Sequence, residues 1–322
     1  MIPPKDKLTL CFAHVAYDFV PQFAKRNTGI NCFQVWNRED LDKRVGEADV
    51  LVISGFWQNA LAEKAAKLKF IQSIGAGTDQ FGRDVLQAKG VRLASASGVN
   101  VRAVSEHAMS LILALARRLP EARDNQHKHH WRGMIGDLTQ REDELGGKTL
   151  VIVGLGNIGG RLAQLAKAFD MKVIGVRRDP SAGKGAADSV HAISDLKSLL
   201  PQADIVALTC PLTKETENLI DADALGRMKK SAYLINAARG KVVNEAALIQ
   251  TMKSGAIAGA GIDVTPEEPL PAASPLWDLP NTFITPHTAG ETRKYEDNVL
   301  DILQDNLARL WKGEAKLRNQ IL

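Results

Sequence analysis

Several features that would place this chain in a specialised structural class are missing from its sequence. Only three of its 322 residues are cysteines, and Cys11, Cys32 and Cys210 lie far apart without paired spacing. An odd number of isolated cysteines argues against a disulfide framework and against a cysteine zinc site. The longest apolar run, around residues 109–116, is much shorter than the ~20 residues that a membrane span requires. The sequence therefore predicts neither a disulfide scaffold nor a membrane protein.

Blocks of charge, internal repeats and low-complexity tracts are also absent. The formal net charge of +4 comes from 41 basic and 37 acidic residues scattered along the chain. Without a basic block of the kind that binds nucleic acid, small phosphate-bearing molecules are the favoured anionic partners. The N-terminal apolar run ends at His14 and Asp18, and is too short and polar for a signal peptide. We therefore expect a cytoplasmic protein that binds neither nucleic acid nor a membrane.

What remains is the composition of an ordinary globular protein, with 45% hydrophobic and 24% charged residues. At about 150 residues per domain, a chain of 322 residues suggests two domains. In the first hundred residues, a helical run near 60–68 accompanies the predicted strands "LTLCFA", "FQVW", "DVLVIS", "LKFIQSIG" and "VRLAS". Strands that alternate with helices predict a parallel sheet covered on both faces.

A second alternating series follows a long helical pattern at 103–130, which Pro120 interrupts. The predicted strands of this series are "TLVIVG", "MKVIGV", "DIVALTC", "AYLINA", "AGIDV" and "TFITP". Strands in such a series fit a doubly wound sheet. A final helix is predicted at 291–313, and we assign it with residues 1–100 to one domain, into which the other is inserted.

Glycines follow the first strand of this second series. "VIVGLGNIGG" places Gly154, Gly156 and Gly159 in the G-x-G-x-x-G spacing, which alone is a weak signal because tight glycine turns are common. The context strengthens it, since a buried-type strand precedes the glycines, a helical pattern follows them, and another strand begins at Met171. In such a unit, glycines let the backbone approach a pyrophosphate at the helix N-terminus. The pattern predicts a dinucleotide-binding domain.

The second strand of this unit ends in an unexpected way. A dinucleotide site generally carries an acidic residue about 20 positions after the first glycine, where it binds the adenine ribose. "KVIGVRRDP" instead places Arg177 and Arg178 there, with Arg177 lying 23 positions (177 − 154) after Gly154. Either the glycine motif is only a structural turn, or the bound dinucleotide carries a group that arginine binds.

Polar side chains follow three later strands of the series. "LINAARG" ends near Arg239, "AGIDVTPEEPLP" contains Asp263 and Glu268, and "FITPHTAG" contains His287. Each of these residues alone is more often a solvated cap or a surface residue than a functional group. Open α/β sheets bind ligands at the carboxyl ends of their strands, so these side chains could share one crevice. Together they suit hydride transfer from a nicotinamide to a carbonyl, with a side chain supplying the proton.

These motifs in their order resemble the D-isomer-specific 2-hydroxyacid dehydrogenases, a family that includes glyoxylate/hydroxypyruvate reductases and phosphoglycerate dehydrogenase. The resemblance runs from about Leu68 to the last helix and rests on "IGAGTDQF", "GVNVRAVSEHA", "GKTLVIVGLGNIG", "CPLTKETENLI", "LINAARGKVV", "GIDVTPEEPLP" and "TPHTAG". It implies an α/β fold of two doubly wound parallel-sheet domains. A Rossmann dinucleotide domain, 101–287, would be inserted into a flavodoxin-like substrate domain, 1–100 and 288–322, with the active site in the cleft.

The resemblance also implies how the substrate, a small 2-oxo or D-2-hydroxy acid of the glyoxylate or hydroxypyruvate kind, would be bound and reduced. Arg239 would hold its carboxylate and carbonyl, and His287, paired with Glu268, would be the acid/base. In the other domain, the backbone that would bind the substrate carboxylate belongs to Gly75, Ala76 and Gly77.

For the cofactor, the resemblance places Asn157 and Ile158 at the pyrophosphate and Asp263 at the nicotinamide carboxamide. The full set of residues expected at the cofactor is Gly154, Gly156, Asn157, Ile158, Gly159, Arg177, Arg178, Thr209, Cys210, Pro211, Ala237, Ala238, Asp263, His287 and Gly290.

Two positions depart from the family pattern. Thr265 stands where an aromatic residue is common, and Arg177 stands where members that use NAD usually carry the ribose-binding acid. Members that use NADP often have arginine there, and an acid would repel the charge of a 2′-phosphate. The sequence therefore favours NADP(H), with NAD(H) the alternative if Arg177 and Arg178 are only exposed surface charges.

Other assignments remain open or are disfavoured. A phosphoglycerate-type dehydrogenase is one alternative, although the chain lacks the C-terminal regulatory domain that many such enzymes carry. A dinucleotide-sensing regulatory protein is another, because the family includes corepressors that keep the same catalytic set; the absence of a long disordered tail argues against it. Formate is disfavoured as the substrate, since the family's formate enzymes have glutamine at the position of Glu268.

Two further expectations concern metals and assembly. "HKHHW" at 127–131 resembles a metal cluster, but its histidines do not share one helix face and no other ligands accompany them, so we expect no metal site. The helix at 103–119 is more hydrophobic all round than one packed face requires, and the family typically dimerises through the dinucleotide domain. We therefore expect a homodimer.

Overall fold

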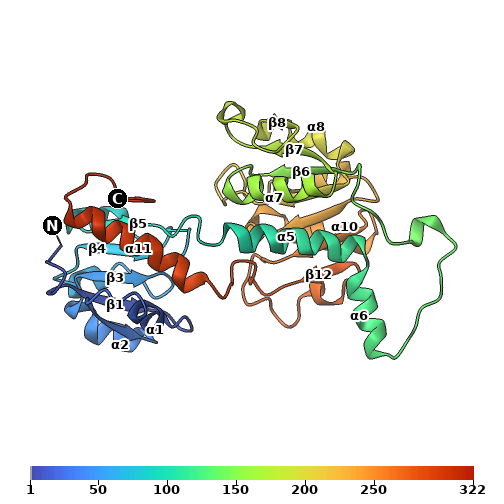
Figure 1. Ribbon diagram of the computed structural model, residues 1–322. Helices are drawn as coiled ribbons and strands as arrows, with labels where there is room; N and C mark the ends of the chain where they lie inside the picture. The colour runs from blue at the N-terminus through green and yellow to red at the C-terminus, as the bar shows by residue number, and fades with distance from the viewer. Residues whose placement is uncertain (1) are drawn as a thin grey trace. The chain divides into compact units, whose positions relative to one another are not determined.

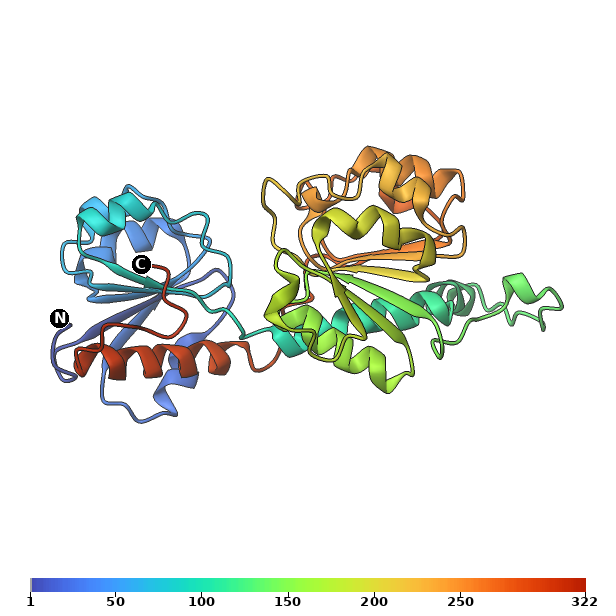
Figure 2. The same ribbon diagram turned by 90° about the horizontal axis from the view of Figure 1, so that it is seen from above.

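Two parallel sheets organise residues 2–322, the part of the chain that the computed structural model describes (Figures 1 and 2). Unit 1 consists of the chain up to Asn100 together with Thr292–Leu322, and unit 2 is Val101–Glu291. The second boundary expected from the sequence, 287/288, lies four residues earlier than this one. Residues 288–291 lie in unit 2 because the carboxylate of Asp263 accepts hydrogen bonds from the backbone amides of Thr288 and Ala289.

The sheet of unit 1 has five strands, all parallel, in the order β2-β1-β3-β4-β5. The strands are β1 (Thr9–Ala13), β2 (Asn31–Val35), β3 (Val50–Ile53), β4 (Phe70–Ser73) and β5 (Arg92–Ala94). Strands β3 and β4 are buried along their whole length, as expected when helices cover both faces of a parallel sheet. This strand order is that of the flavodoxin-like fold.

Two cores lie on the two faces of this sheet. Side chains such as Leu10 and Phe12 pack with α1 (Phe19–Ala24) and α11 (Tyr295–Trp311) on one face. On the other, side chains such as Cys11 and Leu51 pack with helices α2 (Arg38–Arg44), α3 (Leu61–Lys64) and α4 (Arg83–Ala88). The alternation of adjacent residues between the cores follows from the two-residue period of a strand. Of these short helices, the sequence had singled out only the run at 60–68.

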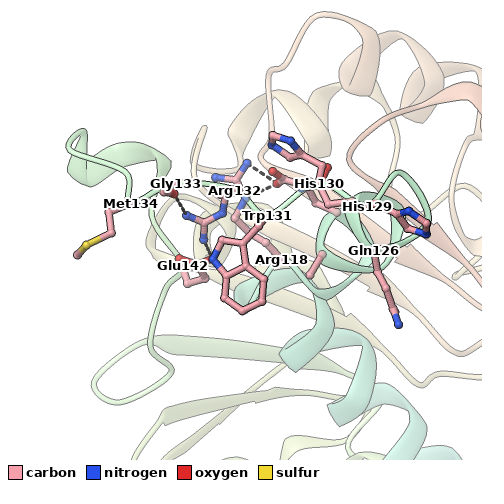
Figure 3. A pocket seen from close by; sticks show the side chains of 12 residues that line it. Arg118, Gln126, His129, His130, Trp131, Arg132, Gly133, Met134 and Glu142 are labelled. Carbon is pink, nitrogen blue, oxygen red and sulfur yellow. Dashed lines mark hydrogen bonds and ion pairs between the residues drawn. The ribbon is translucent and has the colours of Figure 1, made fainter.

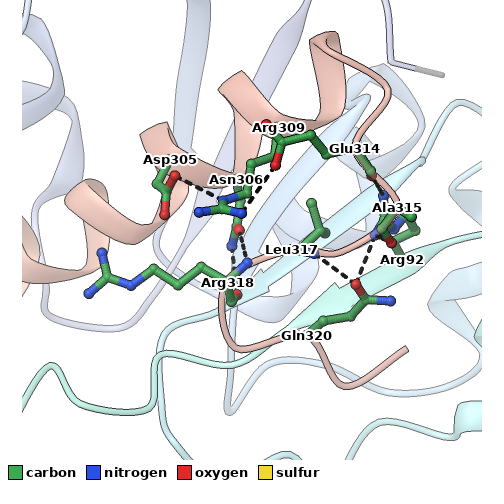
Figure 4. A network of polar contacts seen from close by, with 9 residues as sticks. All are labelled: Arg92, Asp305, Asn306, Arg309, Glu314, Ala315, Leu317, Arg318 and Gln320. Carbon is green, nitrogen blue, oxygen red and sulfur yellow. Dashed lines mark hydrogen bonds and ion pairs between the residues drawn. The ribbon is translucent and has the colours of Figure 1, made fainter.

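The C-terminal segment of the chain covers the edge of this sheet. Residues 319–322 run antiparallel beside β5, with backbone hydrogen bonds that link Leu93 to Ile321 and Leu322, and Ser95 to Asn319. Figure 4 shows how Arg92 fastens the segment by donating to the carbonyl of Ala315 and to Oε1 of Gln320. An edge strand paired in this way no longer presents free backbone groups.

The sheet of unit 2 has seven strands, all parallel, in the order β12-β11-β10-β9-β6-β7-β8. The strands are β6 (Thr149–Val153), β7 (Lys172–Val176), β8 (Ser189–His191), β9 (Ile205–Leu208), β10 (Tyr233–Asn236), β11 (Gly259–Ile262) and β12 (Thr282–Ile284). The order reverses between β6 and β9, as in a Rossmann fold. The two doubly wound parallel α/β sheets confirm the predicted fold class. The sequence missed only β8, a half-buried edge strand of three residues.

Helices cover both faces of this second sheet (Figure 2). One face carries α5 (Val101–Ala116) and α7 (Asn157–Ala168), and the other α8 (Leu196–Leu199), α9 (Ala222–Arg227) and α10 (Glu245–Lys253). The predicted break at Pro120 is displaced: α5 ends at Ala116, and Pro120 lies in the first turn of α6 (Leu119–His127). Proline is tolerated there because it needs no hydrogen-bond partner for its nitrogen. None of the helices within residues 2–322 is long and apolar enough to cross a membrane.

Candidate functional site

The turn between β6 and α7 is built on glycines for two different reasons. Gly154 has a φ of +102°, and a Cβ added to it would lie 2.5 Å from the backbone nitrogen of Cys210. A Cβ on Gly159 would lie 2.3 Å from the carbonyl oxygen of Gly154. The fold itself therefore requires both residues. Gly156, by contrast, faces open space, with no atom within 4 Å of a Cβ built there.

The open space belongs to a cavity of about 370 Å³ at the point where the strand order reverses. Its lining includes most of the predicted cofactor residues that follow β6, β7 and β9: Gly154, Gly156, Arg177, Arg178, Thr209, Cys210 and Pro211. Burial raises the pKa of the Cys210 thiol to about 11, so this side chain is uncharged at neutral pH. Crevices at such switch points are where α/β sheets bind dinucleotides.

The arginines at the end of β7 place two cationic side chains on the rim of this cavity, whose lining also includes Asp179 and Glu215. The guanidinium of Arg177 donates to the carbonyl oxygens of Ala182 and Gly183, and therefore lies across the loop that follows the strand. Asp179 also lines the cavity, but its Oδ1 already accepts hydrogen bonds from the hydroxyl and the backbone amide of Ser181. These bonds hold the pKa of Asp179 below its usual value of 3.8.

A histidine–carboxylate pair lies beyond the carboxyl ends of β11 and β12. Nδ1 of His287 lies 2.7 Å from Oε2 of Glu268. The other carboxylate oxygen, Oε1, accepts the backbone amide of Thr265 at 3.0 Å. Because a carboxylate only accepts hydrogen bonds, Nδ1 of the imidazole carries the hydrogen of this contact. The ring therefore presents Nε2 to a reactant, and 47% of the histidine side chain is exposed.

The backbone at His287 is held in an unusual conformation. Its φ is +55°, a left-handed value that is uncommon outside glycine and costs about 1 kcal/mol or more. The histidine amide donates to the carbonyl of Asp263 at 2.8 Å. The carboxylate of Asp263 is buried and accepts the amides of Thr288 and Ala289. The residue predicted to contact the nicotinamide thus also anchors the loop that carries His287.

Arg239 follows β10, the next strand of the sheet. Its Nη1 donates to the carbonyl of Ala238 at 2.7 Å, and the residue is exposed. The turn before it is shaped by Asn236, whose buried side chain accepts the amide of Ala238 and donates to the carbonyl of Arg239. A Cβ on Gly240 would lie 2.0 Å from the carbonyl carbon of Thr265. The arginine turn and the start of the loop that carries Glu268 are therefore in direct backbone contact.

The predicted substrate-binding backbone lies in unit 1, after the carboxyl end of β4. Gly75 accepts hydrogen bonds from the hydroxyl of Ser73 and the amide of Ala96. A Cβ built on Gly75 would lie 3.5 Å from the hydroxyl of Ser54, which follows β3. Gly75, Ala76 and Gly77 thus form a loop at the ligand-binding edge of their own sheet.

The structure brings together the predicted cofactor residues that follow β6, β7 and β9, and pairs His287 with Glu268. Asn157, Ile158 and Gly159 begin α7, residues 237–238 follow β10, and Gly290 follows the His287 loop. Sequence reasoning missed four residues of this edge: His107, Asn236, Thr265 as the amide donor to Glu268, and Thr285. Asn236 ends β10, Thr285 directly follows β12, and Thr265 lies three residues after β11, so proximity to a strand end was the available signal. His107 lies on a helix, and only tertiary contacts show its place.

Comparison with known proteins identifies the family to which this fold belongs. Residues 109–289 match the model of the D-isomer specific 2-hydroxyacid dehydrogenase NAD-binding domain, which is more than half of the chain. The chain belongs to the D-isomer specific 2-hydroxyacid dehydrogenase family. It is therefore a member of an oxidoreductase family, and its second unit contains a nicotinamide-dinucleotide-binding domain of the Rossmann type.

Several members of this family are similar along most of their length. Glyoxylate/hydroxypyruvate reductase B of Serratia proteamaculans is 37% identical over 87% of this chain and 86% of that protein. D-3-phosphoglycerate dehydrogenase of Methanocaldococcus jannaschii is 35% identical over 86% of this chain, but the match spans only 52% of that protein. The crystal structure of a D-isomer specific 2-hydroxyacid dehydrogenase family protein from Aeromonas salmonicida superposes with a TM-score of 0.84 at 30% identity, covering 98% and 99% of the two chains.

Proposed function

We propose that the protein reduces a small 2-oxo acid of the glyoxylate or hydroxypyruvate kind to the D-2-hydroxy acid, with NADPH as the preferred reductant. The observation that carries this proposal is the contact of 2.7 Å between His287 and Glu268, which leaves Nε2 of the ring available to a reactant. The similarity to a glyoxylate/hydroxypyruvate reductase supports the choice of substrate. When bound, the reduced dinucleotide supplies the hydride that the carbonyl carbon accepts.

The residues of the glycine turn fit a dinucleotide. The space beside Gly156 is open, and the amides of the first turn of α7, which begins at the next residue, have no partners within the helix. A pyrophosphate there is stabilised by those amides and by the helix dipole. A side chain at position 156 would fill the space that the phosphates need. Asn157 and Ile158 begin the helix and would contact the pyrophosphate through their backbone.

In the proposed reaction, His287 provides the proton. When the substrate carbonyl is reduced, negative charge would develop on its oxygen, and Nε2–H of the imidazolium would donate its proton to that oxygen. Glu268 accepts the hydrogen bond from Nδ1–H and so holds the ring with Nε2 directed to the reactant. General acid catalysis of this kind contributes about 10²- to 10⁴-fold to the rate.

Arg239 and the loop of Gly75, Ala76 and Gly77 would hold the substrate. The guanidinium offers a planar fork of donors, which matches the carboxylate and carbonyl oxygens of a 2-oxo acid better than an ammonium does. Its present contact with the carbonyl of Ala238 fixes one side of that fork. The loop amides would add donors for the substrate carboxylate.

The preference for NADPH rests on the rim of the cofactor cavity. Arg177 and Arg178 line it where a ribose-binding acid would otherwise stand, and Asp179 is already engaged by Ser181. A 2′-phosphate would gain a hydrogen bond to a charged group, worth about 1.5–3 kcal/mol or roughly 10- to 150-fold in binding. Because the rim is exposed to solvent, we expect the lower part of that range.

A panel of 2-oxo acids assayed with NADPH and with NADH tests the proposal. We expect glyoxylate and hydroxypyruvate to be reduced, and NADPH to be preferred by about tenfold in kcat/KM. The preference should weaken as salt concentration rises, because ions screen the exposed phosphate contact. Turnover of 3-phosphohydroxypyruvate alone would favour the phosphoglycerate-type alternative, which the Methanocaldococcus relative supports. Tight dinucleotide binding without any turnover would favour a regulatory binding protein.

Variants of the rim sharpen the cofactor assignment. Arg177→Asp should reverse the preference towards NADH, since it restores a ribose acceptor and repels the 2′-phosphate. Arg178→Ala is the matched variant, and it should only soften the preference. If Arg177→Asp leaves the ratio of kcat/KM with NADPH to kcat/KM with NADH unchanged, the two arginines are surface charges and do not determine the selectivity for NADP.

We also propose a homodimer, formed through a different surface from the one that the sequence suggested. Helix α5 buries nine of its sixteen residues inside unit 2, against α7 and the sheet, so it does not offer its apolar face to a second chain. The exposed apolar side chains concentrate instead in α6 and the segment after it, at Leu119, Trp131, Met134 and Leu138, with Trp131 97% exposed. Large exposed apolar groups in one segment are typical of interaction surfaces.

This segment extends away from the sheet of unit 2 (Figures 1 and 2) and borders a cavity of about 690 Å³. Figure 3 shows Trp131, Arg118 and Arg132 along this cavity, and Met134 pointing away from them. Arg132 is fixed by an ion pair with Glu142. Light scattering at micromolar concentration should give a dimer, and Trp131→Ser with Met134→Ser should give a monomer. A monomeric wild type would refute the assembly while leaving the reaction untouched.

A further inference from the structure

A series of hydrogen bonds between side chains joins the loop that carries His287, residues 285–289, to helix α5. Nε2 of His107, on α5, lies 2.9 Å from the hydroxyl of Thr285, which directly follows β12. That hydroxyl donates to Oδ1 of Asp263 at 2.6 Å. The carboxylate of Asp263 in turn accepts hydrogen bonds from the backbone amides of Thr288 and Ala289, which directly follow His287 in the sequence. All residues of this hydrogen-bond series belong to unit 2 and are buried or half-buried.

The direction of each hydrogen bond follows from the groups involved. A hydroxyl has one hydrogen, and that of Thr285 points to the carboxylate of Asp263. The threonine oxygen can therefore only accept from His107, whose Nε2 must carry a hydrogen. This holds for the neutral ring in its Nε2–H form and for the imidazolium alike. His107 thus fixes the rotation of the threonine hydroxyl, and the hydroxyl in turn fixes one oxygen of the carboxylate.

The far end of this chain is the strained part of the loop. His287 has a φ of +55°, and its amide donates to the carbonyls of Asp263 and Thr285. Such a conformation persists only when surrounding contacts over-determine it. The contacts that do so here come from Asp263 and Thr285, the two residues that His107 reaches.

We propose that His107 is a positioning residue for the catalytic histidine, acting through the hydroxyl of Thr285 and the carboxylate of Asp263. It holds the loop of residues 285–289 so that Nε2 of His287 meets the carbonyl oxygen of the substrate. The inference rests on the proposed reaction for its kinetic consequence, but the hydrogen-bond chain itself can be measured without turnover. Nε2 of His107 contacts the hydroxyl of Thr285 at 2.9 Å and lies 3.5 Å from Oδ1 of Asp263, so His107 acts on the catalytic histidine only through these two residues.

Substitutions at Thr285 test this hydrogen-bond series with side chains of similar size that either keep or remove the hydroxyl. Thr285→Val keeps the volume and removes the hydroxyl, whereas Thr285→Ser keeps the hydroxyl and removes a methyl group. Thr282→Val, at the start of the strand that Thr285 follows, is the control, because the hydroxyl of Thr282 is buried and has no hydrogen-bond partner among the described residues. We expect Thr285→Val to lower kcat about tenfold or more with little change in KM, and the other two variants to stay near wild type.

Substitutions at His107 test the same chain from its other end. His107→Gln places an amide donor where Nε2 stood, and His107→Leu removes the donor. We expect the leucine variant to lower kcat about as much as Thr285→Val does, and the glutamine variant to recover most of the loss. Combining His107→Leu with Thr285→Val should add little to either single change, because residues of one hydrogen-bond chain are not independent.

Amide hydrogen exchange supplies the readout that needs no substrate. In Thr285→Val, exchange at Thr288 and Ala289 should be about tenfold faster than in wild type, and in Thr282→Val it should be unchanged. The inference is overturned if Thr285→Val matches wild type in exchange and in kcat, or if Thr285→Ser falls as far as Thr285→Val. If wild type reduces no 2-oxo acid but the exchange results hold, the proposed reaction fails and the hydrogen-bond chain stands.

Discussion

Both units are doubly wound parallel sheets with a histidine at the carboxyl edge, but Nδ1 of that histidine has opposite hydrogen-bond partners in the two units. His14 follows β1 of unit 1, and its Nδ1 accepts the backbone amides of Ala16 and Tyr17. His287 follows β12 of unit 2, and its Nδ1 faces the carboxylate of Glu268. Both residues lie beyond the carboxyl end of a parallel strand, so the fold alone does not distinguish them.

The partner of Nδ1 decides what each ring can do. Amide donors require a lone pair on Nδ1 of His14, so its hydrogen lies on Nε2, and burial lowers the pKa of the ring. A carboxylate instead requires a hydrogen on Nδ1 of His287, so Nε2 is the nitrogen that faces a reactant. A histidine at a strand end can therefore donate a proton from Nε2 to a reactant only when Nδ1 faces a hydrogen-bond acceptor.

The largest expected effect tests that distinction directly. His287→Ala should lower kcat for 2-oxo acid reduction by about 10²-fold or more, because the oxyanion loses its proton donor. The dissociation constant of the reduced dinucleotide, measured by fluorescence titration, should stay nearly unchanged. A variant with kcat near that of wild type would remove His287 from the mechanism.

A smaller effect is expected at the arginine of unit 2. Arg239→Lys keeps the charge but loses the planar fork, so KM for the 2-oxo acid should rise and kcat should fall together, each by roughly tenfold. Steady-state kinetics over a wide range of substrate concentration measure both constants. Wild-type values would mean that the substrate carboxylate is held elsewhere, for example by the backbone of Gly75, Ala76 and Gly77 in unit 1.

Two glycines of the turn between β6 and α7 are expected to have different roles: Gly156 leaves space for the cofactor, whereas Gly154 is required by the fold. Gly156→Ala should weaken dinucleotide binding by about tenfold and leave Tm nearly unchanged, because its φ of −93° suits alanine and the space beside it is open. Gly154→Ala is the contrasting variant, and should destabilise the protein by about 1–3 kcal/mol through its positive φ and its contact with Cys210. Calorimetry and ligand titration distinguish the two. Equal losses of Tm would contradict the division.

The smallest expected effect concerns the stability of the two units at mildly acid pH. Burial lowers the pKa of His14 from 6.5, so the folded state binds fewer protons than the unfolded chain below that pH. Its contribution to the free energy of unfolding is complete above about pH 6.5 and is lost as pH falls towards the lowered pKa. In unit 2, the backbone amides of Ala224 and Val173 hold the pKa values of Asp221 and Asp188 below 3.8, so the corresponding loss begins only below that pH.

Native-state hydrogen exchange between pH 7 and 5 should therefore show protection factors that decline in peptides of unit 1 before they decline in unit 2. His14→Asn provides an acceptor for the same amides without a titrating group, and should abolish the difference. A decline that persists in this variant would assign the pH dependence to other groups.

Much of the fold follows from local pattern. Eleven of the twelve strands were predicted, because buried parallel strands are short apolar runs between turn residues. The exception, β8, is half-buried and three residues long, so its pattern is too brief to recognise. Short helices such as α1 and α4 also escaped notice, since six residues give less than two turns of periodicity. The break before α6 was misplaced because proline suits the first turn of a helix as well as it ends one.

By itself, the sequence determined the parallel α/β class, the glycine turn, the arginines after β7 and the positions of Arg239, Glu268 and His287 after strand ends, because each depends on residues close in the chain. Only the tertiary structure decided that Glu268 stands behind His287, that Asp263 anchors the catalytic loop, and that His107 reaches Thr285 across 178 positions of sequence. The physical reason is that a side chain's chemistry depends on its hydrogen-bond partner. Such partners are chosen by packing between elements, which no local pattern records.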